Sequence, residues 1–209
     1  PIYNGLNKFN FKELIFTSIL NTSIKVVTGN EKRIRTVLVD NKNNIWEGSL
    51  DAGLDLFNTN EKKFYHYHQN LNSQNTVSND QILCSILDAS GLIWIGTRGG
   101  GIDKIITNNF YRYTHVEEYD NSLSDNVVWA IFEDEKDVWI GTGNGLDRFQ
   151  IESREFKHYA FDPNNPNSIN DNTIYALHKV GTYLWIGTSN GGLNRLNTKT
   201  NEVKHYLPN

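Results

Sequence analysis

Three short turns in this chain carry side chains that could bind a polar ligand. Arg98, Asn144 and Asn190 each stand between a W-I-G-T run and a run that begins with glycine, so they occupy equivalent places. Guanidinium and amide groups donate hydrogen bonds, and loops on a rigid scaffold often carry binding residues. The alternative is that Asn, Gly and Ser stand in these turns because a tight turn needs a positive φ, although no turn requires Arg98.

Trp129 is the one tryptophan that lies outside the repeated W-I-G-T position. It belongs to an apolar run whose other copies have Arg35, Leu83 and Tyr175 at the same place. An aromatic ring at this position could stack on the flat face of a ligand, so Trp129 and Tyr175 are predicted to be ligand-binding residues. The alternative is that Trp129 is a bulky residue that fills a gap in the core.

Other polar residues recur in register with the repeat, which indicates a structural role. Histidine recurs at one position of the repeat, at His66, His158 and His205. Aspartate recurs at another position, at Asp55, Asp103 and Asp147. A catalytic pair of carboxylates breaks the symmetry of a repeat, whereas these residues obey it. The chain also has no Ser/His/Asp or Cys/His constellation and no phosphate loop. We therefore predict no catalytic residue, no enzyme activity, and a hydrogen-bonding role for the aspartates.

Metal and thiol chemistry are not indicated either. His66 and His68 form an H-x-H pair, but no third ligand stands nearby in the sequence. The acidic turns at 88–91 and 134–137 lack the ligand series of a calcium loop. Cys84 is the one cysteine, and the other copies have threonine or alanine at its position, so it is predicted to be a small core residue. We predict no metal site and no cofactor.

The bulk composition excludes further classes of partner. The chain has 209 residues, a formal net charge of −4 and 38% hydrophobic residues, enough for one or two small domains with a core. Mild acidity without a basic patch argues against nucleic acid as a partner. No apolar run approaches the roughly 18 residues of a membrane span, so no direct membrane contact is predicted.

The elements that position these residues are short strands arranged in a repeat. Tryptophans recur at intervals of 45 to 48 residues, at Trp46, Trp94, Trp139 and Trp185. Self-similarity at this period indicates a repeat architecture. Each period contains four short runs bounded by Gly, Asn or Asp, which in the third copy are 127–133, 138–141, 145–149 and 155–159. Four short antiparallel strands per period describe a β-propeller blade.

The predicted fold is all-β, a β-propeller fragment of four four-stranded blades plus an N-terminal half-blade. The blades span 33–68, 69–113, 114–159 and 160–209, and residues 1–32 hold the partial blade and a connection. The half-blade would contain third and fourth strands only, with their partners upstream in a parent protein or in another chain. An open strand edge favours such association. The turns that carry Arg98, Asn144 and Asn190 would share one face of the propeller with the Asn-rich loops between blades.

A motif before each of the last three blades carries a family likeness. It reads TVSND at 76–80, SLSDN at 122–126 and SINDN at 168–172. Together with the W-I-G-T, G-L-[DN]-[RK]-[FL] and F-x-H-Y runs, it resembles the two-component regulator propeller repeat. The resemblance covers about 33–206 and, weakly, 5–9. The first blade is degenerate, because it has Trp46-Glu47-Gly48-Ser49 in place of W-I-G-T.

This resemblance implies a non-catalytic sensor. Such repeats form the periplasmic, extracytoplasmic region of hybrid two-component regulators of Bacteroidetes, which sense glycan fragments and control polysaccharide-utilisation genes. It implies carbohydrate binding, with an oligosaccharide as ligand, and any kinase activity would lie in a separate part of the parent chain. Two alternatives stay open: a protein–protein interaction or dimerisation propeller without a small ligand, and a propeller glycosidase or lyase. Expected partners are missing blades of the parent protein or a second copy of this chain.

Overall fold

The computed structural model describes residues 6–10, 15–19, 33–73, 75–106 and 109–207, and the secondary structure in these segments consists of β-strands without a helix. From residue 34 onward the strands form four four-stranded antiparallel sheets. Within each sheet, every strand pairs with the next strand along the chain. This arrangement confirms the predicted propeller fragment with four four-stranded blades.

The sheets are numbered here in chain order. The first sheet contains β3 (Ile34–Val39), β4 (Ile45–Ser49), β5 (Leu54–Asn58) and β6 (Lys63–Tyr67). The second contains β7 (Ile82–Leu87), β8 (Ile93–Thr97), β9 (Ile102–Ile106) and β10 (Asn109–Tyr113). The third contains β11 (Val128–Asp134), β12 (Asp137–Thr142), β13 (Gly145–Gln150) and β14 (Glu155–Tyr159). The fourth contains β15 (Ile174–Val180), β16 (Tyr183–Thr188), β17 (Leu193–Asn197) and β18 (Val203–Tyr206).

The predicted half-blade is a two-stranded sheet. β1 (Leu6–Asn10) and β2 (Ile15–Ile19) pair in antiparallel fashion over their full length. The connection that we predicted between this half-blade and the first sheet, at 21–32, lies outside the described residues.

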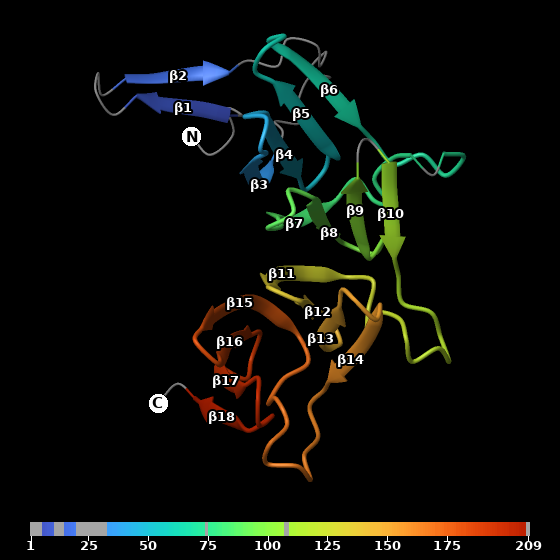
Figure 1. Cartoon of the computed structure of the whole chain (residues 1–209), viewed down its shortest axis with the longest axis vertical. Helices are drawn as coiled ribbons and strands as arrows, with labels where there is room; N and C mark the ends of the chain where they lie inside the picture. Colours follow the sequence, from blue (N-terminus) through green and yellow to red (C-terminus); the bar gives the residue numbers. More distant parts are fainter. Residues whose placement is uncertain (1–5, 11–14, 20–32, 74, 107–108, 208–209) are drawn as a thin grey trace.

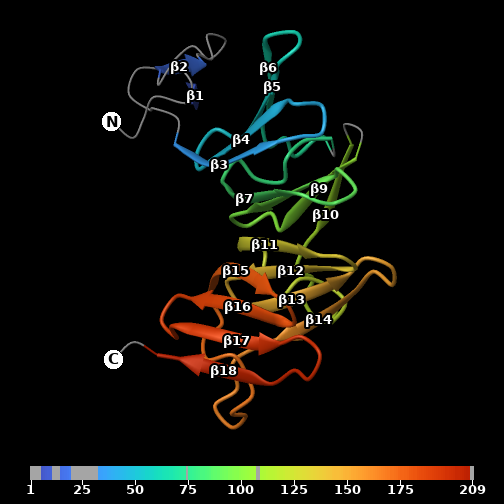
Figure 2. The same cartoon turned by 60° about the vertical axis from the view of Figure 1, so that its left-hand side comes forward.

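The four sheets follow one another along an arc (Figures 1 and 2). The first strand of each sheet contacts the first strand of the next, so that β3, β7, β11 and β15 lie side by side as the innermost strands. The first and fourth sheets stand at opposite ends of this arc in both views. Each of them therefore has one face that is not packed against another of the four sheets.

The hydrophobic core consists of three clusters, one for each junction between neighbouring sheets. At the last junction, Trp139 and Leu146 of the third sheet pack against Ile174 and Ile186 of the fourth. Ile169, from the loop that connects the two sheets, completes this cluster. The other two junctions follow the same rule: the earlier sheet supplies the tryptophan and one aliphatic side chain, Leu54 or Ile102, and most of the other aliphatic side chains come from the later sheet. Each fully buried aliphatic side chain contributes about 1.5–3 kcal/mol, so these junctions dominate the stability of the fold.

The glycine of each W-I-G-T run permits close packing of the sheets. Gly96 lies opposite Cys84 in the strand register. A β-carbon at Gly96 would lie 2.5 Å from the Cys84 sulfur and 2.7 Å from a Val128 methyl group of the next sheet. Burial raises the pKa of the Cys84 thiol to about 12, and its sulfur lies 3.7 Å from the Val128 carbonyl oxygen. Cys84 is thus a small packed residue, as predicted.

We expect Cys84 to resist thiol reagents while the protein is folded. A pKa of about 12, against about 8.5 for a free cysteine, lowers the reactive thiolate fraction about a thousandfold at neutral pH. The check is the rate of reaction with a disulfide reagent in buffer and in urea. Equal rates in the two solvents would contradict the buried position of the thiol.

Candidate functional site

Each innermost strand contains a β-bulge at the position of Trp129. The pairing register with the second strand shifts at Arg35, Leu83, Trp129 and Tyr175. A bulge inserts a residue that has no direct partner and re-aims its side chain. The four innermost strands are neighbours, so the four bulges form a row across the sheets. Arg35, Leu83 and Tyr175, which align with Trp129 in the sequence, therefore each stand at a β-bulge, as Trp129 does.

Two of the predicted site residues meet in this row. The rings of Trp129 and Tyr175 form an edge-to-face pair, with centroids 4.9 Å apart and planes inclined at 88°. Tyr175 is 48% exposed and Trp129 is partly buried, whereas Leu83 is buried. Such a pair contributes about 0.5–1.5 kcal/mol beyond its buried area. Trp129 thus fills space between the third and fourth sheets, and the pair also presents aromatic surface to solvent.

The other three predicted residues lie in the turns between second and third strands. Arg98 follows β8, Asn144 follows β12 and Asn190 follows β16, and all three are exposed. Asn144 Nδ2 lies 3.5 Å from the Ser124 carbonyl oxygen, and Asn190 Nδ2 lies 3.3 Å from the Ser189 hydroxyl. These contacts are long, so they leave both amides able to bind a ligand.

The positive φ of these turns falls on glycine and not on asparagine. Gly101, Gly145 and Gly192 have φ values of 73°, 130° and 71°. Within the described ranges, neither Asn144 nor Asn190 is among the non-glycine residues with positive φ. The tight-turn alternative therefore holds for the glycines of these turns, whereas Asn144 and Asn190 do not themselves adopt a positive φ.

The loops that enter each sheet fix these turns in position. The N–H of Gly101 donates to the Asn126 carbonyl at 2.9 Å, and the N–H of Gly145 donates to the Asn172 carbonyl at 2.7 Å. A turn of one sheet is thus bonded to the loop that leads into the next. The turns and the Asn-rich loops share one face of the propeller, as predicted.

Every side chain of the SLSDN motif at 122–126 contacts its own loop or a neighbouring sheet. The Ser122 hydroxyl accepts a hydrogen bond from the Val116 N–H at 3.0 Å, and Leu123 is buried in the core. The Ser124 hydroxyl donates a hydrogen bond to Asp147. Asp125 accepts from the Val127 N–H at 2.8 Å, and Asn126 accepts from the His115 N–H at 2.7 Å. The equivalent loop at 160–173 repeats several of these bonds. We call this arrangement the inter-sheet clasp. The polar character of these loops is therefore largely structural.

The repeated aspartates anchor the clasp to the third and fourth strands. His158 Nδ1 lies 2.7 Å from Asp147, and the same contact joins His66 to Asp55 at 2.9 Å. In the second sheet, Arg112 takes the place of the histidine and lies 3.4 Å from Asp103. The predicted hydrogen-bonding role of the aspartates is confirmed. The fourth sheet differs, because Asn194 pairs there with Asn170.

The His158–Asp147 pair carries a buried charge. Asp147 is fully buried. The hydrogen bond to Asp147, opposed by partial burial and aided by the Asp120 carbonyl, raises the pKa of His158 to about 9. His158 Nε2 donates to that carbonyl at 2.6 Å. Both ring nitrogens therefore donate, which fits an imidazolium at neutral pH.

The residues considered for metal binding have structural partners. His66 faces Asp55, and His68 lies 3.8 Å from Asp80. Asp88, in one of the acidic turns, accepts the indole N–H of Trp94 at 2.8 Å and two backbone N–H groups. Across the part of the chain that the structure describes, no group of three or more His, Cys, Asp or Glu side chains could hold a metal ion.

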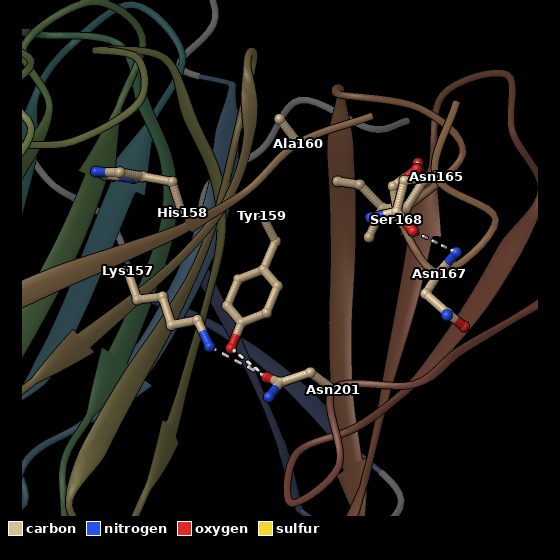
Figure 3. Close-up of a pocket in the computed structure, with 9 residues that line it drawn as sticks. Lys157, His158, Tyr159, Ala160, Asn165, Asn167, Ser168 and Asn201 are labelled. Atoms are coloured by element: carbon tan, nitrogen blue, oxygen red, sulfur yellow. Dashed lines mark hydrogen bonds between the residues drawn. The ribbon is translucent and has the colours of Figure 1, made fainter. Parts of the chain in front are cut away.

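A cavity lies away from the predicted site residues, between β14 and the loop that enters the fourth sheet (Figure 3). It encloses about 310 Å³. The Lys157 amine and the Tyr159 hydroxyl both point at the Asn201 side-chain oxygen, at 3.3 and 3.0 Å, while His158 points away from them. None of the five predicted site residues lines this cavity. The sequence did not indicate it, because Asn201 lies in a turn outside the shared motifs.

These blades, with their repeated tryptophan strand and polar clasp, define a class of propeller. Residues 122–144 match the family model described as two component regulator propeller. This match confirms the resemblance for residues 122–144, which carry the two-component regulator propeller repeat.

The similar proteins are longer than this chain. Histidine kinase P4 of Formosa agariphila is 32% identical over 168 residues, which are 76% of this chain and 12% of that relative. Among solved structures, the extracellular domain of a hybrid two component system from B. thetaiotaomicron has a TM-score of 0.74 at 22% identity, and the match covers 83% of this chain and 24% of that one. PorZ, a surface component of the type-IX secretion system of Porphyromonas gingivalis, has a TM-score of 0.70 at 14% identity, over 98% and 31% of the two chains. These two structures show the shared fold alone.

The described part of the chain contains no helix that is long and apolar enough to cross a membrane.

Proposed function

We propose that this propeller is the non-catalytic ligand-recognition part of a two-component sensor, and that its ligand is a glycan fragment. The observation that carries this proposal is the aromatic pair at the bulges of neighbouring sheets, in which Tyr175 is exposed and Trp129 is partly exposed. The family match supports the sensor class. The chain is similar to a histidine kinase and to the extracellular domain of a hybrid two component system, and both similarities support an extracytoplasmic, periplasmic location.

The aromatic pair lies at the same end of the sheets as the turns. Val128, directly before one bulge, pairs with Thr142, the last residue of β12 before the turn that carries Asn144. Ile174, directly before the next bulge, pairs with Thr188 in the same way. One apolar platform and the exposed amides of Asn144 and Asn190 are thus available on adjoining blades.

This combination suits a sugar. The apolar face of a pyranose ring packs on an aromatic side chain, while its hydroxyl groups need hydrogen-bond donors and acceptors. Amide side chains supply both kinds of group. Arg98, one sheet away, would add a cation for a ligand that carries a carboxylate. The proposed ligand-binding residues are therefore Arg98, Trp129, Asn144, Tyr175 and Asn190.

Signalling would follow from differential binding. A glycan that binds one packing of the propeller against its neighbouring domains more tightly shifts the population toward that packing. The output, control of polysaccharide-utilisation genes through a kinase in another part of the parent protein, depends on that shift. The propeller itself needs no catalytic residue for this role.

We expect Trp129→Ala and Tyr175→Ala each to weaken oligosaccharide binding about tenfold or more, because each removes part of the stacking platform. The measurement is calorimetric titration of the chain with a panel of neutral and acidic oligosaccharides. Tyr111→Ala is the matched control, because Tyr111 is 50% exposed but lies on the outermost strand of the second sheet. It should leave the affinity unchanged.

The possible outcomes distinguish an error in the proposed ligand class from an error in the proposed binding site. If no oligosaccharide binds the chain or a longer form of the protein, the sensor proposal loses its ligand. If one binds with the same affinity to both variants, the ligand stands and the site is wrong. Cleavage of any member of the panel would support the propeller glycosidase or lyase instead.

A further inference from the structure

The cavity beside β14 lies where the fourth sheet departs from the pattern of the third. In the third sheet, Asn121 of the entering loop binds the turn between β13 and β14: its Oδ1 accepts from the Phe156 N–H at 2.8 Å, and its Nδ2 donates to the Arg154 carbonyl at 3.3 Å. Asn167 has the same place in the loop that enters the fourth sheet. It donates its backbone N–H to Asn165 at 3.0 Å, and its side chain has no hydrogen-bond partner among the described residues.

The turn between β17 and β18 binds the third sheet instead of its own loop. Asn201 stands at the place of Arg154, because both residues have a φ of 60° and both donate their N–H to the carbonyl four residues earlier, at 2.8 Å. The Asn201 side-chain oxygen accepts from the Tyr159 hydroxyl at 3.0 Å and from the Lys157 amine at 3.3 Å (Figure 3). The loop and the turn are therefore not joined as they are in the third sheet, and both line the cavity of about 310 Å³.

The wall of this cavity carries a positive charge without an acidic side chain. None of the nine residues that line it is Asp or Glu. The Lys157 ammonium has a neutral acceptor, the Asn201 oxygen at 3.3 Å, and an ionised acceptor would form a shorter and stronger hydrogen bond. His158 also lines the cavity, but its ring points away from Lys157 and is paired with the buried Asp147. Lys157 is thus the cation that a ligand in this cavity would meet.

The remaining polar groups of the wall suit hydroxyl groups. A side-chain amide offers two donors and one acceptor oxygen. The Asn167 amide makes no hydrogen bond within the described part of the chain, and there the Nδ2 of Asn201 also donates to no acceptor. Ligand pockets usually enclose about 300–1,000 Å³, so a cavity of about 310 Å³ suits a small molecule.

We propose that this cavity binds a small organic carboxylate that carries hydroxyl groups. The Lys157 ammonium would bind the carboxylate, and the amides of Asn167 and Asn201 would bind the hydroxyl groups. These three residues belong to the third sheet, the entering loop and the fourth sheet, so the ligand would join parts that Asn121 joins directly one sheet earlier. The site is separate from the aromatic pair, because neither Trp129 nor Tyr175 lines it, and it does not depend on a glycan ligand.

The test is an NMR titration of the whole chain with three probes. Gluconate carries a carboxylate and hydroxyl groups, sorbitol carries hydroxyl groups alone, and acetate carries a carboxylate alone. We expect gluconate to bind about tenfold or more tightly than either of the others, because it alone uses both parts of the site. Gluconate should also shift the side-chain amide signals of Asn167 and Asn201.

Two lysine variants test the charge. Lys157→Gln keeps a long polar side chain but removes the cation, so it should weaken gluconate binding by about tenfold or more. Lys204→Gln is the matched control, because Lys204 has the same place on β18 and does not line the cavity. It should leave the affinity unchanged.

Each contrary result would refute a stated part of the proposal. Absence of gluconate binding would refute the site. Equal affinity for sorbitol, or for Lys157→Gln and the original chain, would refute the role of the charge, and equal affinity for acetate would refute the role of the hydroxyl groups. Trp129→Ala should leave gluconate binding unchanged. A loss of affinity in Trp129→Ala would place gluconate on the aromatic pair and would overturn the assignment to this cavity.

Discussion

Replacement of Gly141 by alanine is expected to lower the free energy of unfolding by about 2–3 kcal/mol, the cost of overpacking a filled core. The new β-carbon would lie 2.7 Å from a methyl group of Ile174 and 2.9 Å from the Ile174 carbonyl oxygen. The carbonyl belongs to the innermost strand of the next sheet, so it cannot move without disturbing the junction. Alanine also restricts the unfolded chain, but this gain of about 0.4–1 kcal/mol is too small to offset the clash.

Gly187→Ala is the matched control for this prediction. Gly187 is the equivalent residue of the fourth sheet, and its nearest contact would be Ala176 at 3.3 Å. The slight crowding and the gain from the unfolded chain should nearly cancel, so the change in stability should stay within about 0.5 kcal/mol. Urea unfolding of both variants measures the contrast. Equal losses at Gly141 and Gly187 would mean that the outer face of the fourth sheet is packed as tightly as a junction.

The strand pattern of the chain was predictable because each period repeats the same local signals. The bounds predicted for the last strand of the third copy, 155–159, agree with β14 at both ends. Turn residues delimit these strands, and three or four copies average out the ambiguity of any single one. The aspartates were assigned to hydrogen bonding because they obey the repeat, and the contact between Asp147 and His158 bears this out.

The bulges were not predictable, because a bulge is a property of pairing between two strands and not of one strand. The sequence shows only that Arg35, Leu83, Trp129 and Tyr175 vary at one position. The contact between Trp129 and Tyr175 depends on both bulges and on the packing of adjacent sheets. In the turns of Asn144 and Asn190 the positive φ is likewise supplied by glycine, at Gly145 and Gly192.

The burial of the repeated tryptophans, Trp46, Trp94, Trp139 and Trp185, also depends on which sheets pack against them. Of the four, Trp46, Trp94 and Trp139 are buried. Trp185 is partly exposed, because its burial requires a following sheet that the described chain does not supply. A repeat motif therefore predicts which face of a sheet forms a junction, but not whether that junction is occupied.

Asp147→Ala is expected to be the second strongly destabilising change, at about 3 kcal/mol. It leaves the partly buried Ser124 N–H and the His158 Nδ1 without their acceptor, and removal of one partner from a buried charged pair costs about 3–5 kcal/mol. The lower end applies because His158 remains about one-third exposed. Urea unfolding at pH 6 measures the loss.

The same pair predicts a pH dependence. The folded protein raises the pKa of His158 from 6.5 to about 9. Because the folded state binds this proton more tightly than the unfolded state, the stabilisation is fully present below about pH 6.5 and is lost as the pH rises toward 9. His158→Gln should remove this part of the decline in stability between pH 6.5 and 9. An unchanged decline would assign it to other groups.

The fourth sheet supplies the control for the clasp. There Asn194 replaces the aspartate and pairs with Asn170, with the two side chains 2.7 Å apart. Transfer of both residues into the third sheet, as Ser124→Asn with Asp147→Asn, should recover much of the stability lost in Asp147→Ala, because the amide pair satisfies its own donors and acceptors. It should also weaken the pH dependence, since the Asp147 carboxylate, the main cause of the raised pKa of His158, is then absent. If stability recovers and the pH dependence stays intact, the stability of the inter-sheet clasp does not depend on the charge of Asp147. The raised pKa of His158 would then be assigned to the Asp120 carbonyl.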